Sequence, residues 1–223
     1  MPGTMVQFTS NGGKTPGYLS LPASGKGPGV VVIQEWWGLV PHIKNVADRF
    51  AAAGYVALAP DLYHGKAAAE PDEARKLMME LQIEQAAKDM AGAVAYLRTH
   101  SAVTPKKVGC VGFCMGGGMT LYLASMGLID AAAPFYGVLT KASPDWRGVK
   151  CPILGHYAEH DGATDSLPAL KEALKKAGKQ AEFHIYPGTQ HAFFNDERTQ
   201  VYNAAAAKLS WERTLAFLGK DLK

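Results

Sequence analysis

The sequence lacks the features that would place it outside the ordinary globular class. Its 223 residues include only three cysteines, an odd number that does not make a disulfide framework. No apolar run approaches the roughly 20 residues that a membrane helix needs. Residues 1–10 lack the basic and apolar regions of a signal peptide. The sequence therefore predicts a cytoplasmic protein with reduced thiols and no membrane contact.

Charge of one sign is not concentrated anywhere along the chain. The 23 basic and 20 acidic residues give a formal charge of +3 and are spread throughout. Because no basic cluster or basic-aromatic stripe occurs, a nucleic-acid partner is not expected. Internal repeats, low-complexity linkers and shifts in composition are also missing. Residues 1–223 are therefore predicted to form one domain, and we expect a monomer.

Segments typical of strands and helices alternate along the sequence. The β-branched run at the start of residues 29–38 is typical of a strand buried on both faces. Further strands are predicted at 5–10, 16–22, 55–63, 106–113, 131–137, 151–159 and 181–188, and helices at 41–54, 71–99, 165–178 and 199–220. This alternation predicts an α/β fold, with a mostly parallel central sheet and helices on both faces.

Four chemically capable side chains follow four of these strands. Glu35 follows the apolar run VVVI, Cys114 follows GCVGF, Asp161 follows ILGHYAEH, and His191 comes shortly after FHIYPG. In a parallel sheet, ligands bind at the carboxyl ends of the strands. We therefore expect these four residues to lie close together.

The segment GFCMG, residues 112–116, matches the strand-turn-helix nucleophile elbow of lipases and esterases, with cysteine in the serine position. Gly112 and Gly116 lack the side chains that would collide in so sharp a turn. The helix N-terminus favours a thiolate at Cys114. A buried structural cysteine or a glycine-rich phosphate loop are the alternatives, but the segment has neither a GK[ST] ending nor G-x-G-x-x-G spacing.

A nucleophilic thiol needs a base and an acid, and the chain offers both in the order of α/β-hydrolases. Cys114 is followed by Asp161 and then by His191. The histidine would exchange a proton with the sulfur, and the carboxylate would hold its tautomer. Asp165 is a rival acid, but it precedes a predicted helix and is better explained as an N-cap.

The remaining histidines and cysteines receive structural or solvent-exposed roles. His156 and His160 have the four-residue spacing of some metal ligands, but a strand or loop does not place two imidazoles on one helical face. No metal site is therefore predicted. The others are expected to be solvated or outward-facing histidines and buried structural cysteines: His42, His100, His184, Cys110 and Cys151.

Glu35 distinguishes this chain from an ordinary esterase. A carboxylate at the end of a buried strand is costly unless it has a partner. The backbone N–H groups of Trp36, its neighbour, and of Met115, after the nucleophile, are positioned by the pattern to bind an oxyanion.

Together, QEWWG, GFCMGG, EHDG and HAFF resemble the dienelactone hydrolase family of α/β-hydrolases, from about residue 5 to the end. The resemblance implies the α/β-hydrolase fold, with Cys114 as nucleophile, His191 as base and Asp161 as its orienter. It also implies that Glu35 is a gate, which keeps the resting thiol neutral until substrate displaces the carboxylate. The family needs no metal or organic cofactor.

The substrate expected from this resemblance is a small lactone or ester. Family members that act on dienelactone bind its carboxylate with arginines, one of them shortly after the catalytic histidine. Here that place holds Phe193, Phe194 and Asn195, and Arg198 comes later. Arg75 is a candidate cation, although a solvated helical arginine is the simpler interpretation. The residues expected to line the substrate pocket are Trp36, Trp37, Tyr63, Arg75, Phe113 and Phe193.

Two alternatives stay open at this point. The same fold supports thioester or peptide cleavage, which acyl-substrate profiling would separate from lactone hydrolysis. A non-catalytic α/β binding module would keep the elbow only as scaffold, and Cys114 would then show no preferential alkylation.

Overall fold

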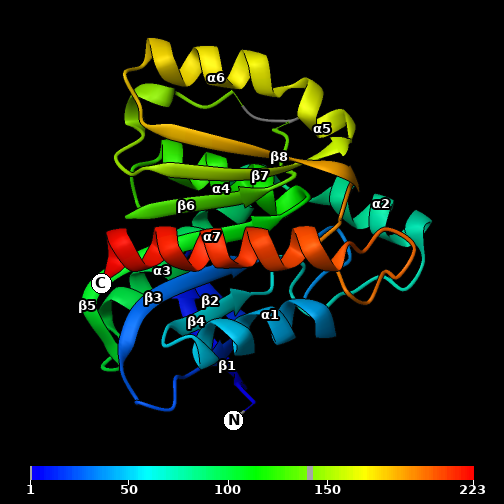
Figure 1. The fold of residues 1–223 in the computed structure, drawn as a ribbon. Helices are drawn as coiled ribbons and strands as arrows, with labels where there is room; N and C mark the ends of the chain where they lie inside the picture. The colour runs from blue at the N-terminus through cyan, green and yellow to red at the C-terminus, as the bar shows by residue number, and fades with distance from the viewer. Residues whose placement is uncertain (1, 140–142) are drawn as a thin grey trace.

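The structure is a computed structural model that describes residues 2–139 and 143–223. One eight-stranded sheet runs through it in the order β1-β2-β4-β3-β5-β6-β7-β8 (Figure 1). Its strands are β1 Thr4–Ser10, β2 Gly13–Ser20, β3 Gly27–Ile33, β4 Val56–Pro60, β5 Val103–Phe113, β6 Ala131–Phe135, β7 Ile153–His160 and β8 Ala181–Gln190. Strands β4, β3 and β5–β8 are mutually parallel, whereas β1 and β2 pair antiparallel at one edge. The predicted mostly parallel α/β sheet is therefore confirmed.

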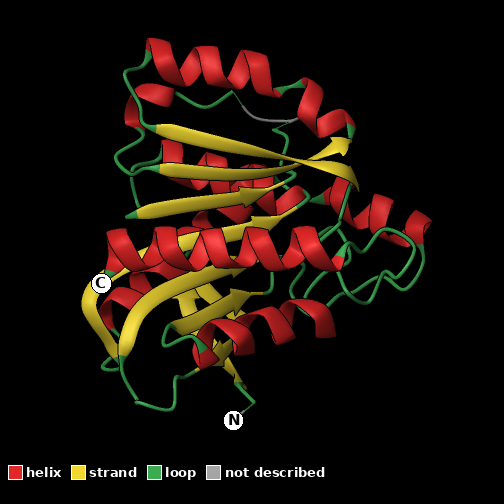
Figure 2. Cartoon of the chain, viewed as in Figure 1, coloured by secondary structure: helices red, strands yellow, loops and turns green. Residues whose placement is uncertain are grey.

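Helices cover both faces of the sheet, as the alternation of the strands requires (Figure 2). Val30 and Val32 of β3 face a core shared with α1 (Pro41–Ala52) and α7 (Ala204–Leu222). Val31 and Ile33 face a second core shared with α3 (Ile83–Thr99) and α4 (Met115–Ser125). Each face of β3 is fully buried, which explains its continuous β-branched run. The remaining helices are α2 Pro71–Glu80, η1 Trp146–Gly148, α5 Gly162–Asp165 and α6 Leu167–Lys176.

The single helix predicted over residues 71–99 is wrong. The chain leaves the helical conformation at Leu81 and Gln82, whose ψ angles are 119° and 114°, and so separates α2 from α3. Neither residue is a helix breaker by type, so tertiary packing overrides local propensity here. The break places Leu81 and Ile83 against the cavity described below.

None of the helices in the described ranges has both the length and the apolar character needed to cross a bilayer.

Candidate active site

The turn from β5 into α4 has the geometry of a nucleophile elbow. Cys114 has φ 55° and ψ −117°, a strained backbone conformation for a residue with a side chain. A Cβ at Gly112 would lie 2.1 Å from the carbonyl oxygen of Gly116. A Cβ at Gly116 would lie 2.4 Å from the carbonyl oxygen of Gln34. Glycine at both positions therefore allows the strand, the helix and the end of β3 to meet around the thiol.

His191 and Asp161 lie side by side at the ends of β8 and β7. His191 Nδ1 and Asp161 Oδ2 are 2.7 Å apart. The other Asp161 oxygen accepts a hydrogen bond of 3.0 Å from the Ala163 N–H, so Asp161 is also the N-cap of α5. This cap fixes the carboxylate while it holds the imidazole.

The capping role predicted for Asp165 is wrong. Asp165 is the last residue of α5 and is exposed, and Ser166, not Asp165, occupies the N-cap position of α6. Sequence reasoning missed the one-turn helix α5, and with it the fact that Asp161 is the capping residue. The carboxylate beside His191 is nevertheless Asp161, as expected from chain order.

The environment of His191 favours its protonated form. Burial lowers the pKa of the imidazole, but hydrogen bonds to Asp161 and Cys114, together with the negative charge of both groups, raise it to about 10. A protonated imidazole that lies between a carboxylate and a thiol stabilises the thiolate. The three side chains therefore form a unit in which the His191 imidazole interacts with both the Asp161 carboxylate and the Cys114 sulfur.

Glu35 is buried, with 1% of its surface exposed, and its carboxylate has partners that the sequence did not reveal. Asn195 Nδ2 donates to Glu35 Oε2 at 2.7 Å, and the Tyr136 hydroxyl lies 3.5 Å from Oε1. Burial and the nearby charges of Glu35 and Cys114 raise the pKa of Tyr136 well above its ordinary value, so its hydroxyl stays a donor. No hydrogen bond joins Glu35 to Cys114 within residues 2–139 and 143–223.

Tyr136 and Asn195 are the site residues that sequence reasoning missed. Tyr136 directly follows β6, has φ 39°, and packs its ring edge-on against His191 with centroids 4.9 Å apart. The strand-end rule that found Glu35 would also have found Tyr136, since AAAPFYG was predicted as a strand. Asn195 carried no such signal, because its contact with Glu35 depends on how the loop after His191 folds.

The two backbone groups predicted to bind an oxyanion belong to segments that meet at the elbow. Met115 is the first residue of α4, where the backbone N–H has no partner within the helix. Trp36 is the third residue after β3, and a Cβ at Gly116 would lie 2.4 Å from the Gln34 carbonyl oxygen, so the start of this loop lies beside the elbow. That both N–H groups bind one oxyanion stays a prediction.

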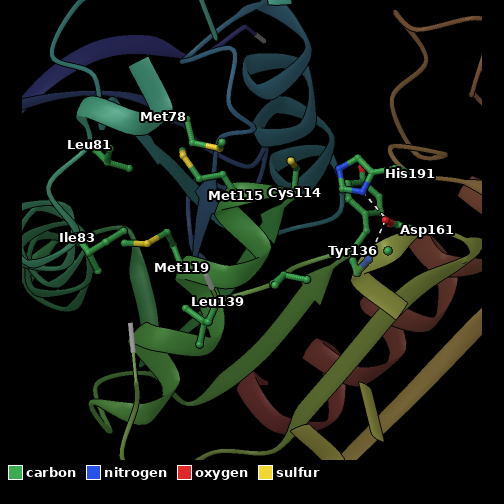
Figure 3. A pocket seen from close by; sticks show the side chains of 13 residues that line it. Met78, Leu81, Ile83, Cys114, Met115, Met119, Tyr136, Leu139, Asp161 and His191 are labelled. Carbon is green, nitrogen blue, oxygen red and sulfur yellow. Dashed lines mark hydrogen bonds and ion pairs between the residues drawn. The ribbon is translucent and has the colours of Figure 1, made fainter. Parts of the chain in front are cut away.

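A cavity of about 360 Å³ opens beside Cys114. Figure 3 shows its two sides, with the thiol between them. His191, Asp161 and Tyr136 lie on one side, and the apolar side chains from α2, α3, α4 and the segment after β6 lie on the other. The apolar lining residues are Met78, Leu81, Ile83, Met115, Met119, Val138 and Leu139.

The residues predicted to line the substrate pocket lie mostly elsewhere. Phe113 and Phe193 are fully buried in the core, where Phe113 stacks on Phe194 and Phe193 packs on Tyr136. Their predicted contact with substrate is therefore wrong, because the core encloses both rings. Arg75 is 64% exposed on α2 and lies 3.9 Å from Asp72, so the solvated interpretation holds.

The other predicted aromatic residues lie closer to the site. Tyr63 is buried, and its hydroxyl donates to Met115 Sδ at 3.4 Å, behind the cavity wall. Trp36 and Trp37 are half-buried and pack edge-on, and the Arg198 guanidinium lies 5.6 Å from the Trp37 ring. These contacts place Arg198 beside the Trp36–Trp37 loop.

Two of the remaining histidines are buried. His42 is 1% exposed, with Nδ1 3.2 Å from Asp196, so its predicted solvation is wrong: α1 turns it toward Phe113 and Phe194. His156 is fully buried and contacts the hydroxyls of Tyr186 and Thr214, whereas His160 is 65% exposed. No cluster of His, Cys, Asp or Glu suited to a metal ion occurs in the described ranges.

The two other cysteines are buried, as expected. Burial raises the pKa of both Cys110 and Cys151 to about 12, so these thiols are not ionised at neutral pH. Cys114 is the half-buried cysteine and the one that lines the cavity.

The sequence profile described as "Dienelactone hydrolase family" matches residues 15–222. The chain belongs to the dienelactone hydrolase family. Its members act on ester or lactone bonds, so this dienelactone hydrolase-like protein is a hydrolase of the carboxymethylenebutenolidase type.

Similar proteins cover nearly the whole chain. "Protein usf" of Aquifex pyrophilus is 40% identical over 99% of both chains. An Aquifex aeolicus protein provisionally named a carboxymethylenebutenolidase is 35% identical over 99% of this chain and all of its own. A crystal structure from Klebsiella pneumoniae, provisionally described as a dienelactone hydrolase, covers 98% of both chains at 28% identity with a TM-score of 0.88. The α/β-hydrolase fold implied by the motifs is thus confirmed.

Proposed function

We propose that this dienelactone hydrolase-like protein opens small lactones or esters with Cys114 as nucleophile. The observation that supports this most is the arrangement around one cavity: a strained cysteine at an elbow, faced by a histidine whose Nδ1 contacts an aspartate that caps α5. Nucleophile, base and orienter are the three parts that covalent acyl transfer requires.

In the proposed reaction, the Cys114 thiolate attacks the acyl carbonyl carbon and forms a C–S bond. The oxyanion that develops accepts hydrogen bonds from the backbone N–H groups of Met115 and Trp36. As the intermediate collapses, the C–O bond breaks and the leaving oxygen takes the proton from His191. His191 then removes a proton from water, whose oxygen attacks the thioester. The acid product leaves, the thiolate re-forms, and the imidazole keeps the proton.

Within this proposal, Glu35 controls the charge of the thiol. Its carboxylate is bound to Asn195 and Tyr136, and no hydrogen bond joins it to Cys114 in the described ranges. A carboxylate that turned toward Cys114 would raise the thiol pKa and accept its proton in a hydrogen bond. Exchange of Glu35 between these two sets of partners would be the gate, with substrate favouring the arrangement in which sulfur is free.

The proposal is tested by comparing Cys114→Ala with Cys151→Ala on a panel of lactones, nitrophenyl esters and thioesters. Cys114→Ala should reduce turnover by at least about 10⁴-fold, as loss of a nucleophile does in other triads. Cys151→Ala should keep wild-type turnover, because Cys151 is buried outside the cavity. Near-normal turnover by a correctly folded Cys114→Ala protein would overturn the proposed function.

A further inference from the structure

One side of the cavity is lined by apolar side chains that have no part in the proposed bond cleavage. Six apolar side chains from four separate segments line the cavity: Met78, Leu81, Ile83, Met119, Val138 and Leu139. All of them except Val138 are labelled in Figure 3, and these five lie on the far side of Cys114 from His191 and Asp161. Apolar surface beside a nucleophile has a use when the substrate has an apolar group to bury against it. Methionine side chains, with three rotatable bonds, adapt to chains of different shape.

The charges around the cavity disfavour an anionic substrate. Among the described residues that line it, none is a lysine or an arginine. Asp161 lines it directly, and the carboxylate of Glu35 contacts the lining residue Tyr136 from behind. A substrate carboxylate on the apolar side would lose its hydration without gaining a cation, at a large cost in free energy. Among the described lining residues, the cationic side chain is His191, and it is already paired with Asp161.

We propose that the enzyme is specific for esters or lactones whose acyl group is an uncharged aliphatic chain, bound against the six apolar side chains of this cavity. This inference rests on the proposed function, since it takes Cys114 as the point where the acyl group is held. It differs from the substrate expected of a dienelactone hydrolase, which bears a carboxylate.

The direct test uses two substrates of equal length, 4-nitrophenyl hexanoate and the mono-4-nitrophenyl ester of adipic acid, which differ by a terminal methyl against a carboxylate. We expect kcat/KM to be at least about 100-fold higher for the hexanoate. From acetate to butanoate, kcat/KM should rise about fourfold per methylene group, which corresponds to about 0.8 kcal/mol each. Equal or higher kcat/KM for the adipate ester would overturn the inference and leave the proposed function standing.

Two neighbouring methionines provide a matched pair of variants. Met78 lines the cavity, whereas Met79, the next residue of α2, is 65% exposed and does not. Met78→Arg should raise kcat/KM for the adipate ester at least tenfold and lower it for the hexanoate, because the guanidinium provides the missing cation. Met79→Arg should leave both values unchanged. The same response in both variants would contradict the location proposed for the acyl chain.

A binding measurement separates failure of this inference from failure of the proposed function. 2-Octanone and 7-oxooctanoate carry a carbonyl in the same position and differ only at the far end, and neither has an ester bond to cleave. Calorimetric titration of Cys114→Ala should give a dissociation constant at least tenfold lower for the ketone. This holds whether or not Cys114 is the nucleophile. Tighter binding of the keto acid would overturn the inference even if all ester hydrolysis failed.

Discussion

Asn195 Nδ2 donates a hydrogen bond of 2.7 Å to Glu35 Oε2, and both side chains are buried. Asn195→Leu removes the donor at similar volume, so we expect Glu35 to turn toward Cys114 and raise the pKa of the thiol. Iodoacetamide should then alkylate Cys114 several-fold more slowly at pH 7 than in the wild type. Loss of the buried hydrogen bond should also lower the free energy of unfolding by about 1–3 kcal/mol, measured in urea.

The control for this prediction is the double variant Asn195→Leu with Glu35→Gln. An amide has no negative charge, so wild-type or faster alkylation should return although Asn195 is still missing. If Asn195→Leu and the wild type alkylate with identical pH profiles, Glu35 does not act on the thiol and the gate is wrong.

His191 makes stability depend on pH in a defined direction. Its pKa is raised to about 10 in the folded protein, from an ordinary value of 6.5. The folded state therefore binds the proton more tightly than the unfolded chain does, and this stabilisation is complete below about pH 6.5. It is lost as pH rises toward 10. Urea unfolding at several pH values should show this loss in the wild type and not in His191→Gln, whereas His160→Gln, an exposed histidine, should behave as the wild type.

For single residues, the sequence predicted which strand-end side chains meet at the site, but it did not predict which side chains line the cavity around them. Cys114, Asp161 and His191 meet because parallel strands end at one edge, which the order of strands already implies. Phe113 and Phe193 were expected in the pocket wall because they adjoin Cys114 and His191 along the chain. In a strand or tight loop, neighbouring side chains point in different directions, and both rings point into the core.

Among the elements, the junction of β5 and α4 leaves no room for an added side chain at Gly116. An alanine Cβ at Gly116 would lie 2.4 Å and 2.6 Å from the carbonyl oxygens of Gln34 and Ile33. Both are backbone atoms at the carboxyl end of β3, and moving them would distort the central strands. Gly116→Ala should therefore lower the free energy of unfolding by about 3 kcal/mol or more and reduce turnover, measured by urea unfolding and ester hydrolysis.

Gly219→Ala is the matched control, since a Cβ at this position of α7 has only the Tyr55 hydroxyl near it, at 3.9 Å. Alanine in a helix interior is favoured over glycine by about 0.5–1 kcal/mol, so this variant should be as stable as the wild type or more stable. Equal destabilisation by both changes would contradict the idea that Gly116 is needed to let α4 approach the carbonyl oxygens of Ile33 and Gln34.

The break between α2 and α3 is a feature of the secondary structure that the sequence pattern did not predict. Residues 71–99 have helical periodicity and no glycine or proline after Pro71 until Gly92, so a continuous helix was the reasonable prediction. Extended backbone at Leu81 and Gln82 instead turns Met78, Leu81 and Ile83 toward α4. Three of the apolar lining residues thus take their positions from a break in the helix that no local sequence pattern predicts.

Over the whole molecule, the candidate site residues follow β3, β5, β6, β7 and β8, and the antiparallel strands β1 and β2 lie at the opposite edge of the sheet from β8. The fold class followed from alternation alone, because crossover helices between parallel strands leave few other arrangements. The contacts that join the antiparallel β1–β2 hairpin to the rest of the protein did not follow from the sequence pattern. Asp89, 1% exposed on α3, accepts hydrogen bonds from Ser10 at 2.6 Å and Thr15 at 2.9 Å, and lies 2.9 Å from His64 Nε2.

This buried carboxylate permits a test of whether residues 1–223 form one cooperative domain, as the sequence predicts. Asp89→Asn keeps the volume but removes the charge that three partners share, and should lower the free energy of unfolding by about 1–3 kcal/mol. Asp72→Asn, whose carboxylate is 95% exposed, should change it by less than about 0.5 kcal/mol. Cys151, buried just before β7, reports on the other side of the sheet through its reaction with iodoacetamide.

In one cooperative domain, damage at the hairpin lowers the stability of every part by the same amount. The urea midpoint for alkylation of Cys151 should therefore shift in Asp89→Asn by as much as the midpoint from far-ultraviolet circular dichroism. In two independent domains, the hairpin side would unfold first and Cys151 would keep its wild-type midpoint. An unchanged Cys151 midpoint beside a lowered dichroism midpoint would contradict the single domain, because β7 and β8 would then fold without the β1–β2 edge.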